Sequence, residues 1–199
     1  IYTGEINKYN GKFEGEGICK FANGSVYKGH WINGHYHGEG KMTYTNGDVY
    51  EGEWKNNKRY GKGTFKFNNG DIYEGEFKYD MIYGEGTMSY TNGDVYKGEF
   101  KDDKKNGKGT MTYTNGYVYE GEFKHGLKYG KGIFIYAPKN IHNILRIEGV
   151  WYYYGLEECN VTYVNGTKKH IIIHNNKYRL LMEEIIKELK NNKFLLNTI

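Results

Sequence analysis

Residues 50–72 read YEGEWKNNKRYGKGTFKFNNGDI, and this stretch decides the fold of the chain. Tyr50, Gly52 and Trp54 alternate with glutamates, which is the two-residue period of a strand with one buried face. Residues 61–67 alternate in the same way, and the Asn-Gly pair that follows supplies the positive φ values of a tight turn. The stretch therefore predicts a two-stranded β-hairpin.

The same hairpin pattern recurs along the chain, and its five close copies, from Tyr27 to Tyr119, start 23 residues apart. Five close copies and two variants begin at Tyr2 (variant), Tyr27, Tyr50, Tyr73, Tyr96, Tyr119 and Ile147 (decayed). One hairpin alone is marginally stable, so neighbouring hairpins must stack against each other. We predict an all-β repeat array: an elongated, curved, single-layer antiparallel sheet of stacked 23-residue hairpins with a C-terminal α-helix.

Three segments follow from this pattern. Residues 1–146 hold the repeat units that start near Tyr2, Tyr27, Tyr50, Tyr73, Tyr96 and Tyr119. Residues 147–174 form a degenerate seventh repeat and a last strand. Residues 175–199 form an amphipathic helix that either caps the array or binds a partner.

Composition agrees with a sheet built on glycine and rings. The 199 residues include 29 glycines and 22 tyrosines but one proline, and aromatic residues make up 17%. Disordered segments are poor in aromatic residues, and collagen needs glycine at every third position, so both classes are excluded. We expect each strand glycine to leave room for a ring of the next unit.

The motif Tyr-x-Gly-x-Trp/Phe, then Gly-x-Gly, then Asn-Gly, at a period of 23 residues, resembles the MORN repeat (membrane occupation and recognition nexus). The resemblance covers about residues 1–166. The glycine that the family usually carries three residues after the Trp or Phe is present only as Gly34 and Gly126. The resemblance implies a non-enzymatic adaptor, often dimeric, in cytoskeletal or membrane-proximal assemblies.

The aromatic face is the candidate partner site. A single-layer sheet cannot bury both faces, and exposed apolar rows mark interaction sites. Each ring taken alone is more often core, but together they predict a groove for a partner helix or peptide. Its residues are Tyr27, Trp31, Tyr44, Tyr50, Trp54, Phe67, Tyr73, Phe77, Tyr90, Tyr96, Phe100, Tyr113, Tyr119 and Phe123.

Charge divides the chain unevenly. The net charge of +4 lies in residues 168–199, so the array is neutral and lacks the basic stripe of a nucleic-acid binder. Turns within the hairpins nevertheless predict a basic rim, formed by Lys58, Arg59, Lys104, Lys105 and Lys128. These basic residues either keep the array soluble or dock an anionic lipid or an acidic protein.

Residues 175–199 show a helical period. The apolar positions recur at i, i+3, i+4, i+7, i+8 and i+11, which predicts one apolar helix face. It comprises Tyr178, Leu181, Met182, Ile185, Ile186 and Leu189. This face caps the array, dimerises or binds a partner.

No constellation in the sequence predicts catalysis, a cofactor or a metal site. His30, His35 and His37 lie close together, but no other unit repeats them and no cysteine joins them. Recurrent glutamate pairs such as Glu51 with Glu53 indicate a solvated face. Two cysteines, no signal peptide and no apolar run of bilayer length predict a cytoplasmic protein without a transmembrane segment.

Three function classes are consistent with the sequence. The leading hypothesis is an interaction scaffold whose partner is a protein helix or peptide, or a second copy of the chain. The alternative is a regulatory or targeting module of a larger enzyme, of the lysine methyltransferase or phosphoinositide kinase type. A phosphoinositide-binding membrane module is a third, which the neutral array argues against.

Overall fold

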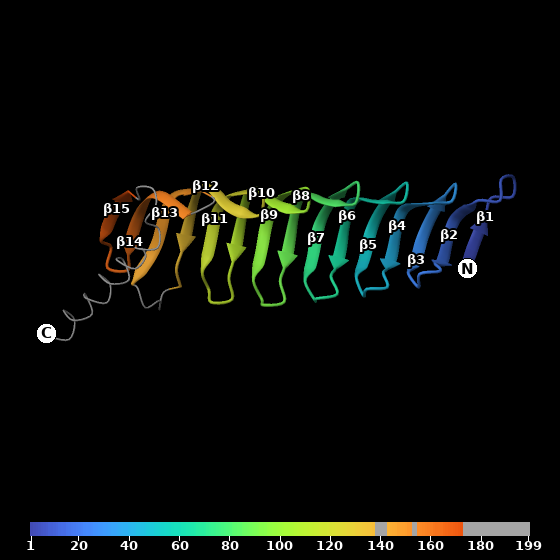
Figure 1. Ribbon diagram of the computed structural model, residues 1–199, viewed down its shortest axis with the longest axis horizontal. Coiled ribbons are helices and arrows are strands. Elements are labelled where there is room, and N and C mark those ends of the chain that lie inside the picture. The colour runs from blue at the N-terminus through green and yellow to red at the C-terminus, as the bar shows by residue number, and fades with distance from the viewer. Residues whose placement is uncertain (138–142, 153–154, 173–199) are drawn as a thin grey trace. The chain divides into compact units, whose positions relative to one another are not determined.

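The computed structural model describes residues 1–137, 143–152 and 155–172, which form strands and turns (Figure 1). Strand order in the sheet follows the sequence from β1 to β15, as an open antiparallel sheet of hairpins. This confirms the predicted all-β fold class. The strands are β1 (Tyr2–Ile6), β2 (Phe13–Lys20), β3 (Val26–Ile32), β4 (His35–Thr43), β5 (Val49–Lys55), β6 (Lys58–Lys66), β7 (Ile72–Lys78), β8 (Met81–Ser89), β9 (Val95–Lys101), β10 (Lys104–Thr112), β11 (Val118–Lys124), β12 (Leu127–Ile135), β13 (Ile144–Tyr152), β14 (Gly155–Tyr163) and β15 (Lys168–Ile172).

The chain divides into two compact units, Ile1–Gly109 and Thr110–Ile199. Both are built from the same hairpin. The predicted helix at 175–199, with its apolar face, lies outside the described residues.

The hairpin of β5 and β6 shows how the two faces arise. Tyr50 pairs with Phe65 and Gly52 pairs with Gly63, and a bulge then brings Trp54 opposite Arg59. Directly paired residues point to the same side of an antiparallel sheet. We call this side the aromatic face, and the side that carries the intervening Glu and Lys residues the polar face.

The first tyrosine of each repeat is the centre of the core. These tyrosines are fully buried: Tyr27, Tyr50, Tyr73, Tyr96 and Tyr119 are 0% exposed. The Tyr50 hydroxyl donates to the Glu53 carbonyl at 2.8 Å. A Cβ at Gly63 would lie 2.5–2.7 Å from the Tyr50 ring end, so this glycine gives its space to that ring. The ring belongs to the same hairpin, and not to the next unit as we expected from the sequence.

Trp or Phe, four residues later, joins one repeat to the next. Trp54 meets Tyr50 of its own repeat edge to face at 4.9 Å and Tyr27 of the preceding repeat at 5.5 Å. Phe77 repeats this arrangement with Tyr73 at 5.2 Å and Tyr50 at 5.0 Å. Edge-to-face pairs of this kind add to the stability gained from burial, so the stacking of hairpins is a continuous aromatic ladder within residues 1–109.

The first glycine of each Gly-x-Gly pair has a different role. Gly61 has φ +63°, and a side chain there would collide with the carboxylate of Glu53. That carboxylate accepts a 2.8 Å hydrogen bond from the backbone N–H of Lys62, and Glu99 binds Lys108 in the same way. These glutamates therefore stabilise the bulge through hydrogen bonds to its backbone, in addition to lying on the solvated face.

Turns within the hairpins tie each repeat to the preceding one. Asp80, at φ +73°, accepts a 2.9 Å hydrogen bond from the Arg59 N–H through its side chain and donates its own N–H to the Arg59 carbonyl at 3.2 Å. Asn57 and Asp103 occupy the equivalent positions, at φ +66° and +62°. Aspartate and asparagine tolerate this left-handed conformation better than other non-glycine residues. Asn57, Asp80 and Asp103 stand where the family usually carries a glycine, three residues after the Trp or Phe. Their side chains also add a hydrogen bond between repeats.

Substitutions at Asp80 should separate these two contributions. Asp80→Ala is expected to lower the free energy of unfolding by about 2 kcal/mol, because it strains the backbone and leaves the Arg59 N–H without its acceptor. Asp80→Gly should cost about 1 kcal/mol, since only the acceptor is lost. Asp80→Asn keeps both and should be nearly neutral. Urea denaturation measures the series; equal losses for Ala and Gly would contradict the backbone contribution.

Candidate functional site

Most of the predicted groove residues are buried in the fold itself. Ten of the fourteen form two inner rows with little surface left: Tyr27 (0% exposed), Trp31 (2%), Tyr50 (0%), Trp54 (4%), Tyr73 (0%), Phe77 (3%), Tyr96 (0%), Phe100 (4%), Tyr119 (0%) and Phe123 (4%). Their rings cannot meet a partner in this conformation. The inner rows hold the hairpins together.

The other four predicted groove residues are half-buried and form what we call the outer row: Tyr44, Phe67 and Tyr90 in residues 1–109, and Tyr113 in residues 110–199. The Tyr44 ring lies 6.2 Å from Phe65, and the Phe67 ring 4.6 Å from the same residue. Phe65 pairs with Tyr50, so the outer row belongs to the aromatic face.

A rigid turn holds each outer-row residue. The Tyr44 N–H donates to the Asp48 carbonyl at 2.9 Å, and the Tyr44 carbonyl accepts from Gly47 at 3.0 Å. The Asp48 carboxylate in turn binds the Asn68 N–H of the next turn at 2.8 Å. The backbone of each outer-row residue is therefore fixed by hydrogen bonds at both its N–H and its carbonyl.

Three cations lie over rings of the aromatic face. The Arg59 guanidinium carbon is 4.9 Å from the centre of the Phe65 ring and 5.4 Å from that of Phe77. The Lys105 Nζ is 5.7 Å from the centre of the Tyr90 ring. These distances are typical of cation–π contacts.

Lys128 makes the corresponding contacts in residues 110–199. Its Nζ lies 4.4 Å from the centre of the Phe134 ring, 4.8 Å from Tyr119 and 5.4 Å from Tyr113. In each unit, therefore, a cation lies over the ring of an outer-row tyrosine: Lys105 over Tyr90, and Lys128 over Tyr113.

The predicted basic rim is corrected by these positions. Lys58 and Lys104 are exposed, but Arg59, Lys105 and Lys128 are half-buried and lie on the aromatic face. Strand β6 begins at Lys58, three residues before Gly61, where the sequence pattern places its start. Continuing the alternation backwards from Gly63 through Gly61 reaches Arg59, so the sequence did contain the signal.

Burial dominates the electrostatics of this face. It raises the pKa of Tyr44, where the nearby Arg59 acts in the opposite direction, and it raises the pKa of Tyr36 to about 12. Burial lowers the pKa of the Lys105 ammonium, and the Asp94 carboxylate partly offsets that effect.

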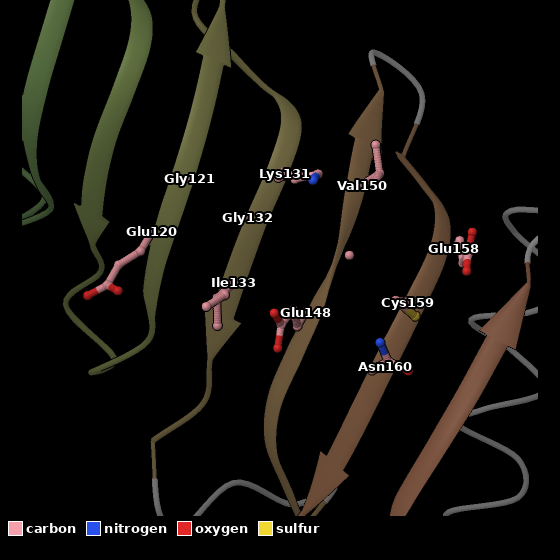
Figure 2. A pocket seen from close by; sticks show the side chains of 11 residues that line it. Glu120, Gly121, Lys131, Gly132, Ile133, Glu148, Val150, Glu158, Cys159 and Asn160 are labelled. Atoms are coloured by element: carbon pink, nitrogen blue, oxygen red, sulfur yellow. The ribbon is translucent and has the colours of Figure 1, made fainter.

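The polar face has a depression of its own in residues 110–199 (Figure 2). It measures about 500 Å³, and sequence reasoning missed it. Ile133 and Val150 give it an apolar floor between carboxylates. Two of those carboxylates are paired, Glu148 with Arg146 at 2.6 Å and Glu158 with His170 at 3.3 Å.

Two features are absent from the described residues. In residues 1–137, 143–152 and 155–172 there is no helix of the length and apolar character that a membrane span requires. Nor do three or more His, Cys, Asp or Glu side chains of these ranges gather into a group that could hold a metal ion.

Comparison with known proteins gives a family and several solved structures. The model of the MORN repeat matches residues 7–26, 27–49, 50–72, 73–95, 96–116 and 119–141. The boundaries at Tyr27, Tyr50, Tyr73, Tyr96 and Tyr119 coincide with the predicted repeat starts. No curated protein matches the sequence.

Among solved structures, similarity is found to the TCP domain of SAS-4 from Drosophila melanogaster in complex with a proline-rich motif of Ana2. That chain is 16% identical with a TM-score of 0.48, and the alignment covers 83% of this chain and 86% of the other. A streptogramin B lyase is 12% identical (TM-score 0.18; 89% and 75% covered). The H270A virginiamycin B lyase from Staphylococcus aureus is also 12% identical (TM-score 0.20; 90% and 76% covered).

Proposed function

The chain belongs to the MORN-repeat family, and we propose that it is a non-enzymatic interaction scaffold that binds a helix or peptide of a partner protein on its aromatic face. One observation carries the proposal: the outer row leaves aromatic surface accessible, on rigid turns, beside an inner core that is already complete. The family resemblance suggests a cytoskeletal or membrane-proximal assembly as the setting.

The arrangement suits recognition of another protein. Tyrosine offers a large apolar ring with a polar tip and few rotatable bonds, and arginine pairs well with both rings and carboxylates. Tyrosine and arginine are among the residue types that dominate binding energy in protein interfaces. The buried inner rows support these side chains from below without contacting the partner.

Replacing the outer row tests the proposal. The triple variant Tyr44→Thr, Phe67→Thr, Tyr90→Thr removes accessible rings from residues 1–109 but leaves the inner rows in place. We expect it to fold and to lose at least about tenfold of its bound partner, because each such ring contributes about 1–2 kcal/mol at an interface. Affinity capture from cell extract with quantitative mass spectrometry measures the loss.

The matched control carries Glu51→Gln, Glu74→Gln and Lys97→Gln, three changes on the polar face of the strands that follow the outer-row turns, β5, β7 and β9. It should recover the same proteins as the wild type. Equal recovery with the outer-row variant, shown to be folded by circular dichroism, would contradict binding on the aromatic face.

A further inference from the structure

We propose that the aromatic face of residues 1–109 takes a partner segment with two acidic side chains, one against Arg59 and one against Lys105. The inference rests on the proposed function and adds the chemistry of the partner. It comes from the placement of charge on the two faces, from the setting of each cation and from the repeat geometry.

Charges are sorted between the faces of this unit. The strand carboxylates lie on the polar face, where Glu51 forms a 3.2 Å ion pair with Lys41 and Glu53 binds the bulge at Lys62. Arg59, in contrast, pairs across the ladder with Trp54 and lies among rings. A segment bound to the aromatic face therefore meets cations from its strands, and acidic side chains are complementary to them.

The setting of Arg59 prepares it for a carboxylate. Its Nη2 donates to the Asp80 carbonyl, and its Nε forms an ion pair with Asp80 Oδ1 at 3.7 Å, which leaves guanidinium N–H groups for a second carboxylate. The side chain is 20% exposed, so the guanidinium is held in place and still reaches the surface. Low polarity around it strengthens a charge-assisted hydrogen bond to an incoming acid.

Lys105 occupies the equivalent place two repeats further on. Its Nζ lies between the rings of Tyr90 and Tyr96, at 5.7 and 5.5 Å from their centres. Burial favours its neutral form, as the lowered pKa indicates. The Asp94 carboxylate offsets that effect only in part. A second acidic group, brought next to the ammonium by a partner, would offset it further, so binding and protonation of Lys105 support each other.

Repeat geometry fixes the spacing of the two acids. Arg59 and Lys105 occupy one position of the repeat, with the buried Ile82 between them. Two strands per repeat at about 4.8 Å each place the cations about 19 Å apart. An extended chain covers that distance in about six residues and a helix in about thirteen.

A random 16-residue peptide library displayed on phage tests this on the whole chain. We expect selection on the wild type to enrich pairs of Asp or Glu separated by about six or about thirteen residues, with apolar residues between them. Selected peptides should bind at least about tenfold more weakly to the R59Q/K105Q variant, the loss expected when charged pairs are broken.

Two further variants make the result specific. K58Q/K104Q removes the same charge from exposed neighbours and should bind like the wild type, and R59K/K105R should retain binding. Circular dichroism and urea denaturation establish that each variant is folded.

The remaining outcomes distinguish the inference from the function on which it rests. Selected peptides without acidic enrichment, or with unchanged binding to R59Q/K105Q, overturn the acidic partner but leave the scaffold. Displacement of the peptides by vesicles of phosphatidylcholine with a phosphoinositide, and not by plain vesicles, would assign the cations to a lipid headgroup. Failure to enrich any peptide, or equal binding to the outer-row variant, contradicts the scaffold itself.

Discussion

Gly63→Ala is expected to lower the free energy of unfolding by about 3 kcal/mol, the upper range for overpacking a core. The added Cβ would lie 2.5–2.7 Å from the Tyr50 hydroxyl, Cε2 and Cζ. Tyr50 cannot move away, because it is 0% exposed and its hydroxyl is bonded to the Glu53 carbonyl. Urea denaturation followed by circular dichroism measures the change.

A double-mutant cycle identifies the cause. In a Tyr50→Ala background the ring is gone, so adding Gly63→Ala should cost less than about 0.5 kcal/mol, since alanine suits a strand better than glycine. Gly34→Ala is the control, because its φ of +82° costs about 1 kcal/mol while the nearest atom is 3.9 Å away. A loss that persists in the Tyr50→Ala background would contradict the steric role of Gly63.

Trp54→Ala should destabilise residues 1–109 by about 3–5 kcal/mol, as expected for a large buried ring. The indole is 4% exposed, meets Tyr50 and Tyr27 edge to face, and donates from Nε1 to the Gly40 carbonyl at 3.0 Å. The substitution removes a cross-repeat contact, so unfolding should also become less cooperative. The same urea titration reports both quantities.

Tyr44→Ala is the matched control on the same face. This ring is half-buried, and we expect a loss of about 1 kcal/mol from its partial burial. Similar losses for the two substitutions would mean that the inner and outer rows do not differ, which would contradict the division of the aromatic face.

Much of this fold can be predicted from the sequence because the same strand and turn signals recur in every repeat. The period of 23 residues and the alternation around Tyr50, Gly52 and Trp54 predict the strands and their faces. Alternation also predicts the face of Arg59, once the strand is extended through Gly61. The predicted position of Arg59 was wrong because the predicted strand started at Gly61; the alternation of faces itself holds.

Other features depend on three-dimensional distances that the sequence pattern does not contain. The bond from Arg59 to Asp80 joins turns of adjacent hairpins, and its partners are 21 residues apart. The clash that makes Gly63 necessary depends on how the Tyr50 ring tilts along its own hairpin. Likewise, the sequence shows that rings gather on one face, but only packing decides which are buried.

The aromatic face therefore contains two groups of side chains, one that stabilises the fold and one that we propose binds a partner. Inner-row rings such as Tyr50 and Trp54 are committed to stability, so their replacement reports on folding. Outer-row rings such as Tyr44 and Tyr90, with Arg59 and Lys105, are the side chains that we propose bind the partner. The proposal therefore requires that outer-row substitutions weaken binding without unfolding the protein.

The most direct measurement compares the outer-row triple variant with the wild type in both properties, by urea denaturation and by capture of partner proteins. The account predicts a variant that still unfolds cooperatively but has lost its partners, while the polar-face control keeps both. A folded outer-row variant that recovers the same partners as the wild type would contradict it.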